Sequence, residues 1–284
     1  MTGIGLTSTL LTAQRIFAAN TRSLAGSLER LSTGKRINRG SDDPAGLITS
    51  ENLLAVLATL GAEVRSLQRA DHVATVADGA LGTTGDLLAE ANALVVANAN
   101  SAGLSDAERQ ANQMQLDSIL ASVNRTARST SFNGQSLLDG SATITAGGEQ
   151  LALQSISTGN LGEVVIDGET YTLADLSGGG RLNIVDGNTE GAQLAISAAI
   201  NEISTMRGRL GALQRNTIHA GIESRTIAIE NTAAANSQIR DTDFAAELVN
   251  LRRAQLLHGA SLVALKLTIS AQSGILALLG RTKD

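Results

Sequence analysis

Several residue types are scarce or missing in this sequence. It contains no cysteine, which excludes disulfides, thiolate metal sites and cysteine nucleophiles. This absence fits a reducing compartment, and it equally fits a chain that is exported unfolded. Aromatic residues make up 1% of the chain, so a core must be built from Leu, Ile, Val and Ala. Such a composition suits helices that pack against helices better than a large β-sandwich or barrel.

Proline and long uncharged runs are also scarce. The one proline is Pro44, and because a proline costs ~3 kcal/mol inside a helix, its rarity favours long unbroken helices. The N-terminal segment does not read as a secretory signal peptide, since no basic residue precedes its apolar part and Arg15 interrupts it. No segment offers ~18 charge-free apolar residues, so we expect no insertion into a membrane.

The charges are distributed unevenly along the chain, whose formal net charge is −5. Residues 1–40 hold six basic residues and one acidic residue, whereas residues 41–240 hold eleven basic and twenty-two acidic ones. A basic arm can mark a nucleic-acid or membrane partner, but polar helix faces explain it as well. We expect no nucleic-acid partner, because no aromatic residues alternate with the basic ones to stack on bases.

Heptad spacing at both ends is the strongest pattern in the sequence. In the N-terminal segment the apolar residues seven apart are Leu10, Phe17, Leu24 and Leu31, with Leu28 extending the stripe. Near the other end one phase holds Leu248, Leu262, Ile269 and Leu276, and a second phase three residues on holds Leu251, Leu265 and Leu279. This spacing predicts two amphipathic helices, each with one narrow apolar seam. Such helices are marginal alone, so we expect the ends to pair with each other or with copies of themselves.

The interior predicts three more helices. The first runs from about Ala45 to Ala99, with Asp43 as its cap and Pro44 at its first position. A capping box from Ser105 to Glu108 opens the second, which ends near the turn residues Asn133 and Gly134. The third follows the β-rich insert, and its two heptad phases hold Ile196, Ile203 and Leu210, and Ala199, Met206, Leu213, Ala220 and Ile227.

Between these helices, the helical period disappears from about residue 137 to residue 188. The alternations TITAGG, EVVIDGETYTL and RLNIV, separated by Asp-Gly and Gly-Gly pairs, predict hairpins. The expected fold is therefore mainly α: a long antiparallel helical bundle with terminal coiled-coil helices and a small β-hairpin insert. We expect a discontinuous terminal domain (1–43 and 242–284), a middle helical bundle (44–137 and 189–241) and the insert (138–188).

Catalytic patterns are almost absent. His72, His219 and His258 are scattered without metal-ligand spacing, and Asp42 with Asp43 fits a helix cap without a metal. The glycine-rich stretch before residue 188 lacks the strand and helix context of a dinucleotide site. We therefore expect neither an enzyme nor a cofactor.

Five ordered segments resemble bacterial flagellin. They are LERLSTGKRINRGSDDPAGL (28–47), RADHVATVADGAL (69–81), STSFNGQSLLDG (129–140), RGRLGALQRNTI (207–218) and QIRDTDFAAELVNLRRAQLLHGASLVAL (238–265). The resemblance runs through both halves of the chain and is least specific in the β-rich insert. Flagellins commonly carry a proline near the last apolar stretch, where this chain has Gln272-Ser273-Gly274, so the end of the terminal helix is a departure.

The resemblance implies an extracellular subunit that self-assembles into the flagellar filament used for swimming, with the paired chain ends as its inner layer and the heptad residues as its assembly seam. Residues 32–43 would be the spoke that joins the inner and middle layers; its expected residues are Gly34, Arg36, Asn38, Asp42, Asp43 and Pro44. The implied partners are other copies of the chain, an export chaperone, the filament cap and hook-junction proteins. Export would proceed by the flagellar type III route without a cleaved signal peptide.

The resemblance also suggests where an animal innate receptor for flagellin would bind. Receptor-sensed flagellins present an Arg, a Leu and a Glu at positions that fall here on Glu90, Leu94 and Gln115, so two of the three differ. Three alternatives stay open at this point. They are a hook–filament junction protein, a flagellin-like surface adhesin, and a membrane-active secreted protein, although the narrow, polar-interrupted seams disfavour the last.

Overall fold

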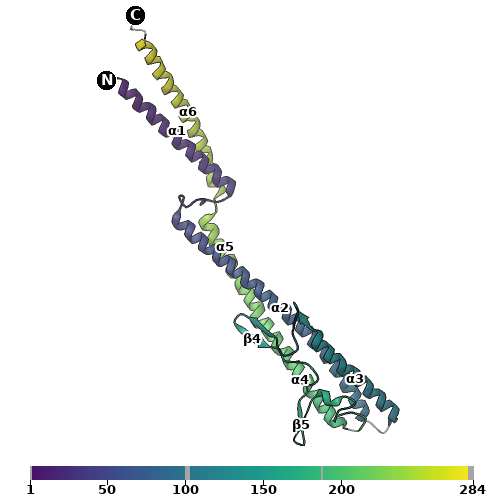
Figure 1. Ribbon diagram of the computed structural model, residues 1–284. Coiled ribbons are helices and arrows are strands. Elements are labelled where there is room, and N and C mark those ends of the chain that lie inside the picture. The colour runs from purple at the N-terminus through teal and green to yellow at the C-terminus, as the bar shows by residue number, and fades with distance from the viewer. Residues whose placement is uncertain (1, 100–102, 187, 281–284) are drawn as a thin grey trace. The chain divides into compact units, whose positions relative to one another are not determined.

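The computed structural model describes residues 2–99, 103–186 and 188–280, with side chains described between residues 8 and 274 of those ranges. Its long helices are α1 (Thr2–Thr33), α2 (Pro44–Ala99), α3 (Asp106–Ser129), α4 (Thr189–Leu213), α5 (Ala220–Arg240) and α6 (Phe244–Gly280). A π-helical segment, η3 (Gln214–His219), joins α4 to α5 without a break, and η2 (Leu173–Leu176) is a short 3-10 helix. The expected mainly α fold with long helices is confirmed (Figure 1).

The chain divides into two compact units. Unit 1 is Met1–Thr59 with Ile229–Asp284, and unit 2 is Leu60–Ala228. Both boundaries lie inside helices, one in α2 and one in α5. The expected three-part division at residues 43, 137, 188 and 241 therefore stays a prediction.

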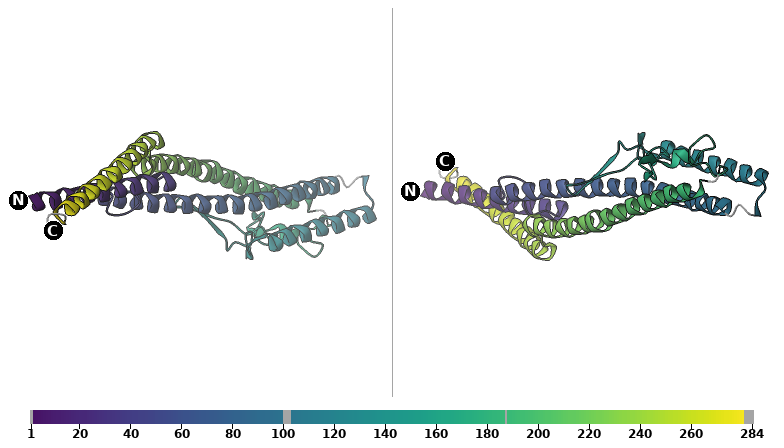
Figure 2. Two further views of the ribbon diagram at one scale, coloured as in Figure 1. Left: turned by 90° about the horizontal axis from the view of Figure 1, so that it is seen from above. Right: turned by 90° about the horizontal axis from the view of Figure 1, so that it is seen from below.

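Unit 1 consists of α1, α6 and the adjoining ends of α2 and α5. Helices α1 and α6 lie side by side and make its largest helix–helix contact (Figure 2). Among the described side chains of this unit, only Ile37 and Ala254 are fully buried hydrophobic residues. Unit 1 is thus built from paired helices without a central core.

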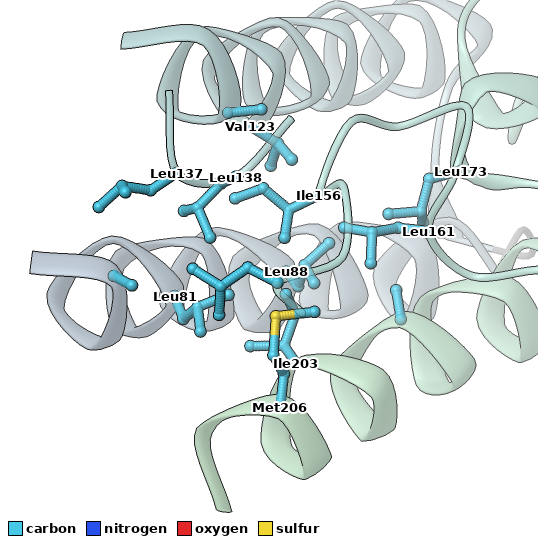
Figure 3. Close-up of a cluster of buried hydrophobic side chains, with 14 of the residues drawn as sticks. Leu81, Leu88, Val123, Leu137, Leu138, Ile156, Leu161, Leu173, Ile203 and Met206 are labelled. Carbon is cyan, nitrogen blue, oxygen red and sulfur yellow. The ribbon is translucent and has the colours of Figure 1, made fainter. Parts of the chain in front are cut away.

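Unit 2 has a continuous hydrophobic core (Figure 3). Helices α2, α3 and α4 and the segment between α3 and α4 all contribute to it, so the β-rich insert shares its core with the helices. The side chains labelled in Figure 3 are Leu81, Leu88, Val123, Leu137, Leu138, Ile156, Leu161, Leu173, Ile203 and Met206.

The segment between α3 and α4 contains three separate two-stranded antiparallel hairpins within the described residues, the first of which precedes the expected insert (138–188). They pair β1 (Ser131–Phe132) with β2 (Gln135–Ser136), β3 (Thr143–Ala146) with β4 (Glu149–Ala152), and β5 (Val164–Ile166) with β6 (Glu169–Tyr171). Asn133 and Gly134 both have positive φ, at 52° and 80°, as a tight two-residue hairpin turn requires. The hairpins expected in TITAGG and EVVIDGETYTL are confirmed.

The prediction of a strand in RLNIV (181–185) is wrong, because these residues form turns. Both Leu182 and Ile184 are buried, and the backbone N–H of Ile184 donates to the side chain of Gln113 on α3 (2.9 Å) rather than to a neighbouring strand. The alternation in the sequence therefore reflects two core contacts made from a loop. Periodicity alone cannot distinguish such a loop from a short strand.

The predicted helix starts of α2 and α3 are confirmed. Ser105 and Glu108 form a reciprocal capping box at the start of α3. At the start of α2, the Asp43 side chain accepts a hydrogen bond from the backbone N–H of Gly46 (2.9 Å), and Pro44 is the first helical residue.

The helix that follows the insert departs from its predicted phase at η3. Ala220 and Ile227 were expected to continue the buried series of Leu213, but Ala220 is exposed and Ile227 is 52% exposed. Gly221 and Ala228, one residue later, are half-buried instead. A π-helical turn holds one more residue than an α-helical turn, so every position beyond it is shifted by one. The predicted phase is therefore wrong beyond Leu213.

Length and composition alone would allow two helices to cross a membrane, namely α2 and the Phe244–Gly274 part of α6. Their apolar windows are 6% and 11% buried inside the chain. A helix whose apolar side chains pack against other protein copies meets the same criterion, so the finding identifies exposed apolar helices and does not define their surroundings.

Candidate assembly interface

The paired helices α1 and α6 run antiparallel. The rings of Phe17 and His258 lie 5.0 Å apart, the Asn20 side chain donates to the backbone carbonyl of Leu257 (3.1 Å), and Arg30 forms an ion pair with Glu247 (3.1 Å). Residue numbers rise along α1 as they fall along α6. The two chain ends thus form the pair that the terminal heptads predicted.

The heptad residues of α1 face this partner. Half-buried positions recur at the expected spacing in Leu10, Phe17, Leu24 and Leu31. Leu28, expected to extend the same stripe, is 50% exposed and lies outside the seam. Polar Asn20 and buried Ser27 alternate with the apolar residues.

The heptad residues of α6 divide between two faces. Leu251, Leu262 and Leu265 are half-buried, whereas Leu248 is 52% exposed and Ile269 50%. The fully buried positions are Glu247, Ala254 and Ser261, each one residue before the predicted phase. The side chains of Leu276 and Leu279 lie outside the described residues.

Apolar residues surround α6 instead of forming one narrow stripe. Val249, Leu256, Val263 and Leu267, called here the outer stripe, are 57–76% exposed. The first three lie two residues beyond the buried positions, which is about 200° around an α-helix. The prediction of a single narrow seam is therefore wrong for α6. Its outer stripe cannot contact α1 of the same chain.

A groove of about 300 Å³ runs beside the helix pair. This groove, called here the α1–α6 groove, is lined by Ser8, Thr9, Thr12, Ala13, Ile16, Ser261 and Ala264. Most of these side chains are small, and they leave an apolar depression on a face different from the outer stripe. Unit 1 therefore has two apolar surfaces, which are the exposed outer stripe and the hollow α1–α6 groove.

The seam also contains a buried carboxylate that the heptad analysis overlooked. Glu247 is 6% exposed and contacts Arg30 of α1. Burial acts to raise the pKa of Glu247, but hydrogen bonds from Ser27 and Asn250 and the charge of Arg30 outweigh burial, and the net pKa is lowered. Because Glu247 lies one residue before the predicted heptad phase, the apolar spacing provided no signal for it.

The segment between α1 and α2 lies against the segment between α5 and α6. The backbone N–H of Arg36 donates to the carbonyl of Arg240 (2.7 Å), and that of Thr242 donates to the carbonyl of Gly34 (2.9 Å). The Arg36 guanidinium donates to the carbonyl of Ile239 (2.7 Å). Gly34 has a φ of 70°, a conformation that favours glycine. The connection that follows α1 and the connection that precedes α6 are thus hydrogen-bonded to each other.

Asp42 organises the turn of this connection. Its carboxylate accepts from the backbone N–H groups of Arg39 (2.9 Å) and Asn38 (3.0 Å), which hold the pKa of Asp42 below its ordinary value. The Asn38 side chain donates to the carbonyl of Lys35 (2.8 Å). Ile37 is buried at the centre of the turn. The six expected spoke residues therefore lie together in one hydrogen-bonded turn that ends at the cap of α2.

The three receptor-equivalent positions lie in unit 2. Gln115 of α3 donates from its side chain to Glu90 of α2 (3.0 Å), and both are exposed. Leu94 is half-buried and packs against the core. The structure thus brings the two differing residues together on one surface. Among the described residues, no group of three or more His, Cys, Asp or Glu side chains is arranged to hold a metal ion.

Paired terminal helices that keep large apolar side chains exposed are typical of helical structural proteins that associate with other chains. Family models for the N-terminal and C-terminal helical regions of bacterial flagellin match residues 7–143 and 194–279. The chain therefore belongs to the bacterial flagellin family, whose members are structural subunits of the flagellar filament.

Individual relatives cover nearly the whole chain. The flagellar filament 30.7 kDa core protein of Treponema maltophilum is 30% identical over 285 residues, covering 94% of this chain and 96% of the relative. Flagellin of Bacillus subtilis is 28% identical over 297 residues, covering 95% and 97%. Among solved structures, Bacillus cereus flagellin is 20% identical, with a TM-score of 0.41 over 59% of this chain and 88% of the other.

Proposed function

We propose that copies of this chain polymerise through the outer surfaces of their α1–α6 pairs. This proposal rests on the exposure of the outer stripe, in which Leu256 is 76% exposed and Leu267 is 66% exposed. An isolated water-exposed helix rarely keeps a continuous line of large aliphatic residues, because each gains about 1.5–3 kcal/mol when it is buried. A second copy supplies the burial that the chain cannot provide for itself.

The outer stripe of one copy packs into the α1–α6 groove of the next. The groove is lined by small residues such as Ala13 and Ala264, and its volume of about 300 Å³ leaves room for branched aliphatic side chains. Because stripe and groove are different surfaces, the copy that contributes its stripe keeps a free groove, and the copy that contributes its groove keeps a free stripe. A head-to-tail contact of this type does not close as a two-fold dimer does, and it produces an open helical polymer when the rotation between successive copies does not close a ring.

The seam residues hold each subunit's own helix pair in the shape that this packing needs. Leu10, Phe17, Leu24 and Leu31 do so from α1, and Leu251, Leu262 and Leu265 from α6. Leu248 and Ile269, exposed in the single chain, join the contact between copies, and Leu276 and Leu279 extend the α6 series. The spoke residues set where the pair leaves the middle helices.

Before assembly, the same apolar surface needs protection. We propose that an export chaperone covers α6 of the unpolymerised chain, and that cap and hook-junction proteins contact the surfaces left free at the two filament ends. The chain reaches the exterior through the flagellar export route without a cleaved signal peptide. The absence of cysteine supports this route, since an unfolded exported chain then cannot form stray disulfides.

Cross-linking tests the head-to-tail contact, because every introduced cysteine in this chain is the only one. One batch carries Thr12→Cys in the groove and another carries Leu256→Cys in the outer stripe. The two batches are mixed, polymerised and oxidised. We expect a disulfide-linked dimer that forms in the mixture and not in either batch alone. A matched control replaces Thr12→Cys with Arg22→Cys, which is exposed on α1 outside the groove.

Two results would contradict the proposal. Efficient dimers from Leu256→Cys alone would indicate that stripes pack against stripes, which gives closed pairs. Equal cross-linking with Arg22→Cys and Thr12→Cys would indicate that the groove has no role.

We also propose that depolymerised subunits activate the animal innate flagellin receptor weakly. Where sensed flagellins present a cation and an anion, this chain presents Glu90 and Gln115. Replacing a guanidinium with a carboxylate turns attraction to an acidic partner into repulsion. Leu94 cannot compensate, since it is half-buried against the chain's own core.

A receptor reporter assay with purified monomers tests this second proposal. We expect partial recovery of activation in the double variant Glu90→Arg, Gln115→Glu, whose new side chains can pair as the present ones do (3.0 Å). The control is Asp86→Arg, an added cation one turn away on α2. Potent activation by the unmodified monomer would refute the proposal.

A further inference from the structure

The π-helical segment η3 interrupts what is otherwise one continuous helix from Thr189 to Arg240. Within the described residues it is the only π-helical segment. Such segments are rare, occur mostly as single-turn bulges inside α-helices, and are frequent at functional sites. Ile218 within η3 is fully buried, so the segment is held in place by packing and is not a frayed end.

One carboxylate of the neighbouring helix spans η3 from its first residue to its last. Asp71 Oδ1 on α2 lies 3.0 Å from Gln214 Nε2 and 3.2 Å from His219 Nε2. Gln214 Nε2 also lies 3.2 Å from Thr75 Oγ1, one turn along α2. The distance between residues 214 and 219 along the helix depends on whether the turn is π or α, so a group bonded to both ends favours one form.

A second contact holds η3 from the side of the insert. Thr217 Oγ1 donates to Glu149 Oε2 of β4 (2.7 Å). Gly147 at the turn of the same hairpin approaches Thr217 so closely that a Cβ there would lie 3.1 Å from the threonine methyl group. Two independent elements, α2 and the β3–β4 hairpin, thus contact the polar side chains of this one turn.

Beyond η3, the sequence contains a second series of apolar residues. With the π-helical turn in place, here called the π form, these residues remain exposed. Ile227 is in phase with Leu213 for an unbroken α-helix, yet it is 52% exposed. In a straight α-helix, residues 220 and 227 would take the places now held by Gly221 and Ala228. The chain therefore contains residues suited to both registers of α5 against α2.

The close approach of Leu67 to Gly221 gives the π form a small steric advantage. A Cβ at this position would lie 3.1 Å from Leu67 Cδ1 on α2. In the α form Ala220 would bring such a Cβ to this place, and Leu67 would have to move by a few tenths of an ångström. The steric cost is small, so the side-chain contacts of Asp71 are needed to decide the register.

We propose that η3 is a one-residue register switch and that Asp71 holds it in the π form. Loss of the extra residue from the turn rotates every side chain beyond it by about 100°. The two forms then present different faces of α5 to surrounding molecules. The switch itself is a property of the single chain. Its consequence for a filament rests on the proposed function, because there a neighbouring copy would contact one face of α5 or the other.

Two matched disulfides report the register in the soluble full-length chain. Leu67→Cys with Gly221→Cys forms readily in the π form, and Leu67→Cys with Ala220→Cys forms readily in the α form. The measured quantity is the ratio of their oxidation rates. We expect the Gly221 pair to dominate in the parent chain. Asp71→Ala should shift the ratio towards the Ala220 pair by at least about tenfold, since two hydrogen bonds to a carboxylate are lost.

Two controls separate a register change from simple loosening. Asp78→Ala removes a carboxylate that pairs with Arg207 on α4, before η3 (2.9 Å), and it should leave the ratio unchanged. Deleting Asn216, which is exposed, converts η3 to an α turn while Ile218 and Gly221 keep their places. In that variant the Gly221 pair should dominate whether or not Asp71 is present.

Each remaining outcome overturns the proposal. A ratio that stays within twofold after Asp71→Ala would show that Asp71 does not hold the register. An equal response to Asp71→Ala in the Asn216 deletion variant would show that the helix loosens without changing register. Neither result depends on whether the chain polymerises.

Discussion

Units 1 and 2 are both helical, but they bury opposite kinds of residue. Unit 2 encloses a core of Leu, Ile, Val and Ala from three helices and the insert. Among the described side chains of unit 1, the fully buried set has two hydrophobic members, Ile37 and Ala254, and four polar ones, Ser27, Ser50, Glu247 and Ser261. Many of its large aliphatic residues, such as Leu256 and Leu267, are exposed. Unit 2 can therefore repay its ordering entropy alone, whereas unit 1 needs additional burial from other copies.

The largest effect should come from a charge in the α1–α6 seam. Leu24→Asp or Leu262→Asp places an unpaired carboxylate in every helix pair of a polymer, at a cost of several kcal/mol per subunit. We expect no filaments by electron microscopy, with unchanged thermal unfolding of unit 2. Ser23→Asp, which adds the same charge at an exposed neighbouring position, is the control. Normal filaments from either leucine variant would disprove the seam assignment.

Matched truncations should separate the two units. Leu88→Ala in the core of unit 2 should destabilise the monomer by about 2–5 kcal/mol. Leu251→Ala in unit 1 should leave monomer unfolding unchanged and raise the concentration needed for polymerisation, because unit 1 has little buried core of its own and we expect its helix pair to be stabilised mainly on assembly. Circular dichroism and calorimetry of monomers, with sedimentation of polymers, measure both effects. Strong amide protection at both ends of the monomer would contradict this division.

The buried Glu247 should make the helix pair sensitive to acid. Its folded-state pKa is lowered, so the ionised carboxylate stabilises the folded pair above its unfolded pKa of about 4.3, and this contribution is lost as the pH falls through the lower folded value. Sedimentation from pH 6 to pH 3 should show dissociation at the acidic end. Glu247→Gln should weaken the filaments at neutral pH and flatten this dependence. An unaltered acid transition in this variant would assign the effect to other carboxylates.

The smallest effect should come from the spoke. A Cβ at Gly46 would lie 2.4 Å from Asp43 Oδ2 and 2.8 Å from Ile37 Cδ1. Because Ile37 is buried and Asp43 caps α2, Gly46→Ala should cost about 1–2 kcal/mol, seen as a raised critical concentration for polymerisation. Gly79→Ala, in the same helix with open space around it, should be neutral or stabilising. Improved polymerisation of Gly46→Ala would mean that the turn is not constrained there.

Local signals in the sequence predicted the elements well. The heptads, the capping box at Ser105 and the Asn133-Gly134 turn each act within a few residues, and the structure confirms the helices and the hairpin turn that they mark. The α1 seam of Leu10, Phe17, Leu24 and Leu31 could be identified in the same way. The grouping of the spoke residues came from the family resemblance and not from periodicity.

What the sequence by itself determined is which segments are helical, where they start, and that the two ends are apolar enough to need partners. Tertiary structure decided the register of each face: the one-residue offset of the buried positions in α6, the extra residue in η3, and the packing of Leu182 and Ile184 from a loop. The reason is that a shift of one residue turns a helix face by about 100° and leaves local propensity unchanged. Side chains distant in the chain, such as Asp71 beside η3 and Arg30 beside Glu247, select among registers that the sequence alone leaves nearly equal.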